Sequence, residues 1–422
     1  MRILWFTNTM SCYTPVGNDF SRGYNGGGWI SSAERIIKTE KDIELAVSFI
    51  CDNQPFKQIQ KEVAYYPVPS YNCCETRYSG FIKDLLYAGS FKKERAKWHY
   101  YTDYYNKIIS DFRPDVIHVW GSEFYSGLVS MITKTPVVLH IQGSLIPYYN
   151  AFLPPFFSWK SFIFSTWNPF RVLRQYVIKK QWEMDCYREQ EIYNNVNMFL
   201  GRTEWDKSVS HVLNPSSHYF HVDEILRDVF YKNGTRVFPQ KLTIVTTISH
   251  PIYKGFDLIL KTAKLLKDRL HLDFEWNCYG NVNPSLIEKQ TGINHSDVNV
   301  ILKGVISPEE LYKAELESTL YFHPSYIDNS PNSLCEAQIL GIPVVCTDVG
   351  GVSSLVQNKI TGFTIPANDP FQGATIIEML YMNKELNYRI GDAGKAEAQK
   401  RHNVERIKNQ LLYVYNSVIS QS

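Results

Sequence analysis

The feature that most constrains the fold is an alternation of short apolar runs with longer amphipathic segments, which occurs in two blocks along the chain. Short apolar runs indicate buried strands, and strands that alternate with helices indicate a parallel, doubly wound sheet. The first block contains RILWFT, IELAVSF, DVIHVW and PVVLHIQ, with an amphipathic segment over 92–112. The second contains LTIVTTI, LDFEWNCYG, VNVILKG, TLYFHP and PVVCTD. We therefore expect an α/β protein with two doubly wound domains.

The length of 422 residues also exceeds what one compact core normally holds. We place the junction between the two domains near residues 213–240, where turn-forming residues occur and no long apolar periodicity is present. The predicted domains are 1–225 and 240–403. The segment from Val404 to Ile419 has apolar residues at helical spacing, so it predicts a helix that needs a surface to cover.

The composition excludes several classes of protein. Lys and Arg exceed Asp and Glu by only 2, so no overall field attracts nucleic acid. The eight Cys residues lack metal-ligand spacing, and several lie in apolar runs, which favours reduced, buried thiols in a cytoplasmic protein. The N-terminal apolar run is shorter than a signal-peptide core, and no window is long enough to span a membrane.

The stretch SYIDNSPNSLCEAQILGIPVVCTDVGG begins at Ser325 and contains the local signals of a helix. Ser330 is a suitable N-cap, Pro331 fits a first turn and Gly341 suits a left-handed end, which predicts a helix over 331–340. Its N-terminus follows a strand, at the carboxyl edge of the sheet, where ligands of doubly wound folds bind. Free backbone N–H groups at such a position attract phosphate.

Two acids accompany this predicted helix. Glu336 falls in the second turn, with its carboxylate free to accept two ribose hydroxyls, and Asp328 precedes the cap. Alternatively, Glu336 is an ordinary acid favoured by the helix dipole by about 0.3–1 kcal/mol, and Asp328 is a solvated loop residue. The next strand ends at Gly350 and Gly351, which permit close backbone approach. Two adjacent turns of this kind favour a nucleotide-diphosphate site.

These residues resemble the signature of glycosyltransferase family four (glycosyl transferases group 1), retaining enzymes of the GT-B fold. The resemblance comprises an acid-x7-Glu motif followed by Ala, Gly-x-Pro-Val-Val and a Gly-Gly turn, and it covers nearly all of 242–366. The N-terminal half is similar to the family's acceptor domain through NGGGWISSAERII, RPDVIHVWG, PVVLHIQGS and GRTEWDKS. The resemblance implies two Rossmann-like domains that face a cleft, with the helix at 404–422 crossing back to complete the first domain.

The resemblance also implies roles for individual residues. Glu336 would hold the donor ribose, and Asp328 would lie beside the donor sugar, where the family usually has Glu. Lys254 would meet the diphosphate, and a cation at a helix N-terminus does require an anion to offset the dipole. His140 would line the donor-sugar pocket, with a core histidine as the alternative. The predicted catalytic set is therefore Asp328, Glu336, His140 and Lys254.

Further contacts are predicted around this set. The predicted donor-binding residues are Ser249, His250, Gly280, Val305, Ile306, Ser330, Asn332, Ser333, Leu334, Gly350 and Gly351. The triplet Gly26, Gly27 and Gly28 is predicted to form an acceptor or phosphate loop, with a plain flexible loop as the alternative.

The chain departs from the family pattern at two places. The family commonly has an Arg a few residues before the lysine, where this chain has Ser249 or His250. Either His250 or an Arg from elsewhere compensates, or diphosphate binding relies more on helix N-termini. Ser353 and Ser354 stand where many members have Pro-Glu.

The predicted activity is transfer of a sugar from a UDP- or GDP-sugar to a hydroxyl of a glycan or lipid-linked acceptor, with retention, for surface polysaccharide or glycoconjugate synthesis. Electrostatic positioning would do most of the work. The resemblance implies that no metal or other cofactor takes part. The alternatives are a GT-B nucleotide-sugar epimerase and a non-catalytic sugar-nucleotide-binding protein.

One segment indicates a membrane partner. No Asp or Glu occurs from Phe124 to Trp182, and residues 151–182 mix Phe and Trp with Lys and Arg. Such a mixture suits the inner face of a membrane that carries a lipid-linked acceptor. The alternative is an insertion whose aromatic side chains pack on the first domain.

Overall fold

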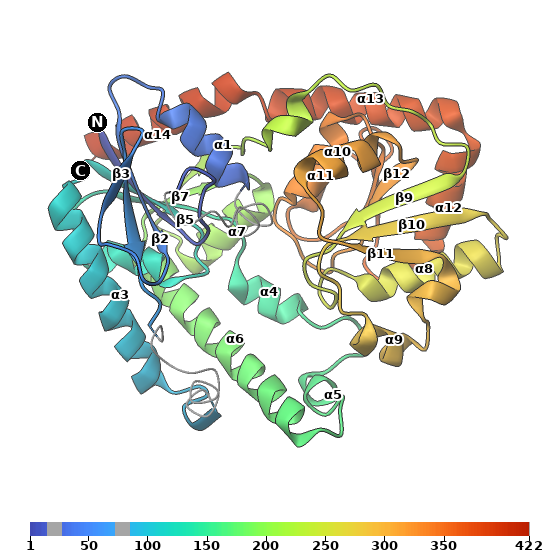
Figure 1. Cartoon of the computed structure of the whole chain (residues 1–422), viewed down its shortest axis with the longest axis horizontal. Coiled ribbons are helices and arrows are strands. Elements are labelled where there is room, and N and C mark those ends of the chain that lie inside the picture. Colours follow the sequence, from blue (N-terminus) through green and yellow to red (C-terminus); the bar gives the residue numbers. More distant parts are fainter. Residues whose placement is uncertain (15–27, 72–84, 422) are drawn as a thin grey trace.

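The computed structural model of the chain describes residues 1–14, 28–71 and 85–421 and shows two α/β domains side by side (Figure 1). The first sheet has eight strands in the order β3-β4-β2-β1-β5-β6-β7-β8, all parallel except β3, which pairs antiparallel with β4. The second has six parallel strands in the order β11-β10-β9-β12-β13-β14. The predicted fold of two doubly wound domains is confirmed.

The elements of the first domain follow one another as strand and helix. Its strands are β1 (Arg2–Thr7), β2 (Glu44–Ile50), β3 (Gln58–Gln60), β4 (Val63–Val68), β5 (Val116–Trp120), β6 (Val137–His140), β7 (Met198–Gly201) and β8 (His218–His221). Its helices are α1 (Gly28–Ile37), α3 (Phe91–Phe112), α4 (Leu145–Ala151), α5 (Trp159–Ile163), α6 (Pro169–Asn195) and α7 (Glu204–Leu213).

The second domain repeats this arrangement. Its strands are β9 (Leu242–Thr247), β10 (Phe274–Tyr279), β11 (Val300–Gly304), β12 (Leu320–His323), β13 (Val344–Thr347) and β14 (Phe363–Ile365). Its helices are α8 (Phe256–Asp268), α9 (Ser285–Thr291), α10 (Pro308–Leu316), α11 (Asn332–Ile339), α12 (Pro370–Met382) and α13 (Lys384–Arg401), which leads to α14 (Val404–Ser420). Within the described residues no helix has the length and apolar character to cross a membrane.

The segment predicted as the junction, 213–240, contains a strand of the first sheet, which the predicted first domain of 1–225 includes. Residues 218–221 lie inside the predicted 213–240 segment, but they form β8 and pair with β7 at the edge of the first sheet. The strand HYFH was missed because it is an edge strand with only partly buried side chains and two histidines. The connection between the two sheets therefore starts after His221.

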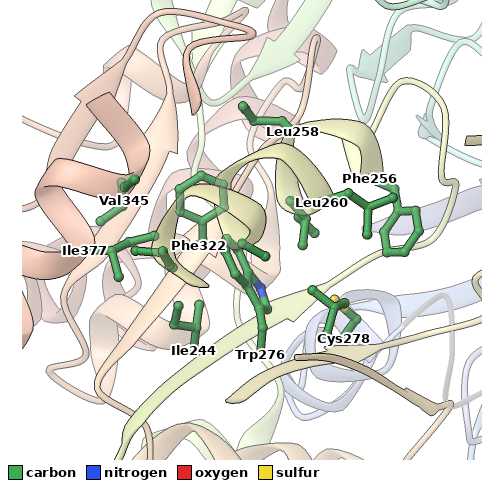
Figure 2. Packing of buried hydrophobic residues seen from close by; sticks show 14 of the residues in the cluster. Ile244, Phe256, Leu258, Leu260, Trp276, Cys278, Phe322, Val345 and Ile377 are labelled. Atoms are coloured by element: carbon green, nitrogen blue, oxygen red, sulfur yellow. The ribbon is translucent and has the colours of Figure 1, made fainter. Parts of the chain in front are cut away.

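The core of the second domain lies between its sheet and helices α8 and α12 (Figure 2). Trp276 is fully buried, and its indole N–H donates to Thr246 Oγ1 at 3.0 Å, so the polar group of this large side chain is satisfied. Cys278 belongs to the same core, and Cys335 and Cys346 are also buried free thiols. These three cysteines behave as small apolar residues, as expected from their sequence context.

Helix α14 returns to the first domain (Figure 1). Its buried stripe of Ile407, Leu411, Val414, Tyr415 and Val418 packs with the first domain's core. The Tyr415 hydroxyl accepts from the Trp5 indole at 3.2 Å and lies 2.7 Å from His118 Nδ1. The apolar face of the C-terminal helix, which its sequence period predicted, is thus buried against the first domain.

His118 makes the stability of this interface depend on pH. Burial lowers its pKa to about 3, whereas an unfolded histidine has a pKa of about 6.5. The stabilising contribution is therefore present above pH 6.5 and falls by about 1.4 kcal/mol per pH unit as the pH drops toward 3. We expect His118→Gln to reduce the number of protons taken up on unfolding at pH 5 by about one. Urea denaturation across pH 5–6.5 measures this slope, and an unchanged slope would contradict the assignment.

Candidate active site

A cavity of about 530 Å³ opens at the carboxyl ends of β9, β10, β11 and β12. This is the edge at which doubly wound domains bind ligands. Eight of the predicted site residues line it, namely Ser249, Lys254, Gly280, Val305, Ile306, Asp328, Asn332 and Ser333. The other lining residues include Arg227, Thr247, Ile248, Tyr279, Asn281, Leu311, His323 and Pro331.

The centre of the cavity is a buried ion pair. Lys254 Nζ donates to Asp328 Oδ2 at 2.5 Å, and His323 Nε2 lies 3.0 Å from the same oxygen. Burial alone would raise the pKa of Asp328, but Lys254 and His323 outweigh this effect and hold the pKa below its ordinary value. Burial likewise opposes the charge of Lys254, but Asp328 raises the pKa of the ammonium group. Both groups therefore stay charged at neutral pH.

The first domain contributes to the loop that carries Asp328. Tyr148 of α4 donates to Asp328 Oδ1 at 3.4 Å and accepts from the backbone N–H of Asn329 at 3.1 Å. Thr203, which caps α7, donates to Asn329 Oδ1 at 2.8 Å. The loop that carries Asp328 is therefore positioned by side chains of the first domain as well as by its own domain.

The carboxylate of Glu336 is not free, in contrast to the expectation from sequence. Arg227 donates to it twice, with Nε 2.7 Å from Oε1 and a terminal nitrogen 2.6 Å from Oε2. Glu336 is buried, whereas Arg227 reaches into the cavity from the connection between the domains. Burial would lower the pKa of Arg227, but Glu336 and the nearby Glu315 raise it. The guanidinium therefore brings a positive charge to the cavity wall.

The helix predicted over 331–340 begins one residue later. Pro331 is the N-cap of α11, and no side chain caps the helix, so the N-cap role predicted for Ser330 is wrong. Proline has no N–H and its carbonyl can accept the first helical bond, which explains this position. Gly341 has φ of +82°, which confirms the left-handed end. Leu334 is fully buried in the core of the second domain, and its N–H donates to the Pro331 carbonyl. Its side chain is therefore not exposed for the predicted contact with a sugar-nucleotide donor.

Gly350 and Gly351 approach another loop of the protein. A Cβ atom on Gly350 would lie 2.0 Å from the carbonyl oxygen of Asp328, and one on Gly351 would lie 2.2 Å from that of Asn329. The Gly351 N–H also donates to the Asp328 carbonyl at 2.9 Å. These glycines let the 328–329 backbone pack closely, and their contact with a donor stays a prediction. Ser354, where Pro-Glu was expected, accepts from the N–H of Glu204 in the first domain at 3.2 Å.

Of the two predicted histidines, His140 is buried and His250 is half-buried. His140 is 1% exposed and stacks on Trp120 with a centroid distance of 4.8 Å, so it lies outside the residues that line the cavity. Its catalytic role stays a prediction. His250 stacks on Tyr253, and burial together with Lys254 lowers its pKa to about 4. At neutral pH His250 is uncharged, so it brings no positive charge to the position of the missing arginine, and its contact with a donor stays a prediction.

The glycine triplet is partly described. Gly26 and Gly27 lie outside the described residues, but Gly28 begins α1. A Cβ atom on Gly28 would lie 2.7 Å from Arg227 Cγ. The start of α1 therefore packs directly against the arginine that pairs with Glu336.

Sequence reasoning missed Arg227, His323 and Tyr148. His323 ends a predicted strand at the same sheet edge as Asp328, and this position was an available signal. Arg227 and Tyr148 reach partners 109 and 180 residues away in the chain, so no local pattern marks them. Among the described residues, no group of three or more His, Cys, Asp or Glu side chains is arranged to hold a metal ion.

Two parallel-sheet α/β domains and a C-terminal helix that returns to the first define the GT-B class of proteins. In agreement, the chain superposes on the sucrose-phosphate synthase of Thermosynechococcus elongatus with a TM-score of 0.69 and 13% identity, covering 100% of both chains. It also superposes on Anabaena Alr3699/HepE in complex with UDP-glucose with a TM-score of 0.61 and 14% identity, covering 99% and 100% of the two chains. At these identities the likeness shows the fold.

Residues 232–397 match the family described as glycosyl transferases group 1. The capsular polysaccharide biosynthesis glycosyltransferase CapM of Staphylococcus aureus is 28% identical over 144 residues, which are 32% of this chain and 37% of CapM. The chain thus matches well under half of the length of this curated relative. These matches confirm the resemblance to the group 1 glycosyltransferases.

The packing of Gly350 on the Asp328 loop has a measurable consequence. Gly350→Ala introduces a Cβ atom against a backbone oxygen at a positive φ, so we expect a loss of about 2–5 kcal/mol in the free energy of unfolding. Gly292 also has a positive φ, of +67°, but its Cβ position is open, so Gly292→Ala is a matched control with a loss of about 1 kcal/mol. Urea denaturation of the two variants compares them, and equal losses would contradict the proposed packing.

Proposed function

We propose that the protein is a retaining glycosyltransferase that moves a sugar from a UDP- or GDP-sugar to a hydroxyl of a glycan or lipid-linked saccharide during surface polysaccharide or glycoconjugate synthesis. The observation that carries this proposal is the convergence of Lys254, Arg227 and the start of α11 on one cavity wall. Two fixed cations and a helix N-terminus suit a diphosphate. The proposal is supported by the UDP-glucose bound to a protein of the same fold and by the polysaccharide role in the name of CapM.

The chemistry follows from the charges at this wall. The bond between the sugar's anomeric carbon and the diphosphate breaks, the acceptor oxygen bonds to the same carbon from the same face, and the acceptor proton passes to the departing diphosphate. Lys254 and Arg227 stabilise the negative charge that develops on the leaving group. Asp328 stays ionised because its pKa is lowered, so it stabilises the positive charge on the sugar. In this proposal the two side-chain cations do the work that a metal ion does in other transferases.

Arg227 supplies the positive charge that the family's usual arginine would provide. It lies on the cavity wall, whereas His250 is neutral at pH 7. Each oxygen of Glu336 accepts one bond from Arg227 and has a second lone pair, so the same carboxylate can also accept the ribose hydroxyls. In this arrangement Arg227 both orients Glu336 toward the ribose and faces the diphosphate.

A donor screen tests the proposed activity. The protein is incubated with UDP- and GDP-sugars, with and without candidate saccharide acceptors, and free nucleotide is measured. We expect one donor to release its nucleotide in step with acceptor turnover, because the transfer step produces one nucleoside diphosphate per glycosidic bond. Conversion of the donor sugar without stoichiometric release would indicate an epimerase. Binding of a donor with no release or conversion would indicate a binding protein.

The role of Arg227 is tested by binding measurements. We expect Arg227→Gln to weaken binding of the nucleoside diphosphate about tenfold or more, because a hydrogen bond between charged groups contributes about 1.5–3 kcal/mol. Binding of the matching nucleoside, which lacks phosphate, should change much less. His250→Gln is the matched control and should leave the affinity for the diphosphate within about twofold, since His250 is neutral. Calorimetric titration measures these affinities, and equal losses for nucleoside and diphosphate in Arg227→Gln would remove Arg227 from the phosphate site.

A further inference from the structure

The aromatic residues of the 151–182 segment divide into two groups. Phe152 and Phe162 are buried, and together with Trp159 and Trp182 they pack in the main core cluster of the second domain. The alternative that these aromatics pack on the first domain is therefore wrong for this group. The segment leaves the first domain through α4 and covers the second domain, so these side chains hold the two domains together.

The second group faces solvent. Trp167 is 100% exposed, Phe170 is 72% exposed and Phe164 is 65% exposed. These three residues, here called the aromatic tip, lie where α5 ends and α6 begins, at one edge of the molecule in Figure 1. Phe156, in the loop before α5, is 93% exposed as well. Large aromatic side chains gathered in this way on a surface mark an interaction site.

The charged residues of the segment itself are all positive from Lys160 to Arg174. Lys160, Arg171 and Arg174 are exposed, and none of them forms an ion pair with any residue that the structure describes. Lys179 and Lys180, farther along α6, are instead paired with Glu183. The surface therefore combines an apolar tip with three cations that have no acid to neutralise them.

We propose that the aromatic tip docks the protein on a bilayer that contains anionic lipids, with the rings at the headgroup boundary and Lys160, Arg171 and Arg174 against the lipid phosphates. Aromatic rings favour this boundary, and cations beside them are attracted to a negative leaflet. A protein partner is a poorer fit, because the rim of a protein interface usually contains polar groups of both signs, whereas every charged residue from Lys160 to Arg174 is a cation. The same segment of the chain also contains Tyr148, which contacts Asp328.

Co-sedimentation of the full chain with vesicles tests the proposal. We expect the wild type to bind vesicles of phosphatidylcholine with about one third phosphatidylglycerol at least tenfold more tightly than vesicles of phosphatidylcholine alone. Changing Phe164, Trp167 and Phe170 together to Ser should lower binding to the mixed vesicles about tenfold or more. Changing Lys160, Arg171 and Arg174 together to Gln should lower it on the order of a hundredfold, since each cation near the surface contributes about fivefold.

Matched controls separate docking from general effects on the fold. Phe371 and Tyr413 are 70% and 68% exposed elsewhere, and changing both to Ser should leave vesicle binding unchanged. Changing the exposed Lys41, Lys134 and Lys232 to Gln should also leave it nearly unchanged. Thermal unfolding midpoints confirm that each variant is folded. A wild type that stays in solution with both kinds of vesicle would overturn the proposal in favour of a protein partner, and a tip variant that binds like the wild type would also overturn it.

Discussion

The buried ion pair between Lys254 and Asp328 is the interaction on which the rest of the site depends. Either charge alone at this depth would cost several kcal/mol, so the two side chains require each other. Their loops are brought together by different means: the Asp328 backbone packs on Gly350, and Tyr148 and Thr203 hold it from the first domain. The position of one carboxylate thus depends on a close backbone contact within the second domain and on contacts across the cleft.

A second ion pair, between Arg227 and Glu336, likewise matches a cation with a buried carboxylate. It contributes to the charge balance of the cavity. Glu315 lies near both, and burial followed by the charge of Glu336 raises its pKa well above the ordinary value. In the two ion pairs, two cations are matched by two carboxylates. A diphosphate that binds at this wall competes with Asp328 for Lys254, and Asp328 keeps His323 as a neighbour at 3.0 Å. In the proposed mechanism, Asp328 therefore keeps a hydrogen-bonding neighbour when Lys254 binds phosphate.

The features predicted correctly from the sequence are those that a local pattern of residues determines. All nine quoted strands are present, because buried parallel strands are apolar along their whole length. Strands β3, β4, β7, β8 and β14 were not predicted. Of these, β3, β8 and β14 lie at sheet edges, and β3 and β8 contain polar residues. The start of α11 was displaced by one residue because Ser330 and Pro331 both suit a helix start. Arg227 was not predicted, since its partner is 109 residues away, and only the folded chain shows that Gly350 approaches a backbone oxygen.

The segment from α4 to α6 joins features that are separate in the sequence. Tyr148 contacts Asp328, and four residues later Phe152 stacks near Tyr253, with a centroid distance of 5.8 Å, beside Lys254. Helix α4 therefore contacts Asp328, and the residue that follows it contacts the tyrosine next to Lys254. The same segment then enters the core of the second domain before it emerges at the aromatic tip. Because its buried half holds the domains in register at the cleft, its exposed half has a fixed position relative to Lys254 and Asp328, which a flexible appendage would lack.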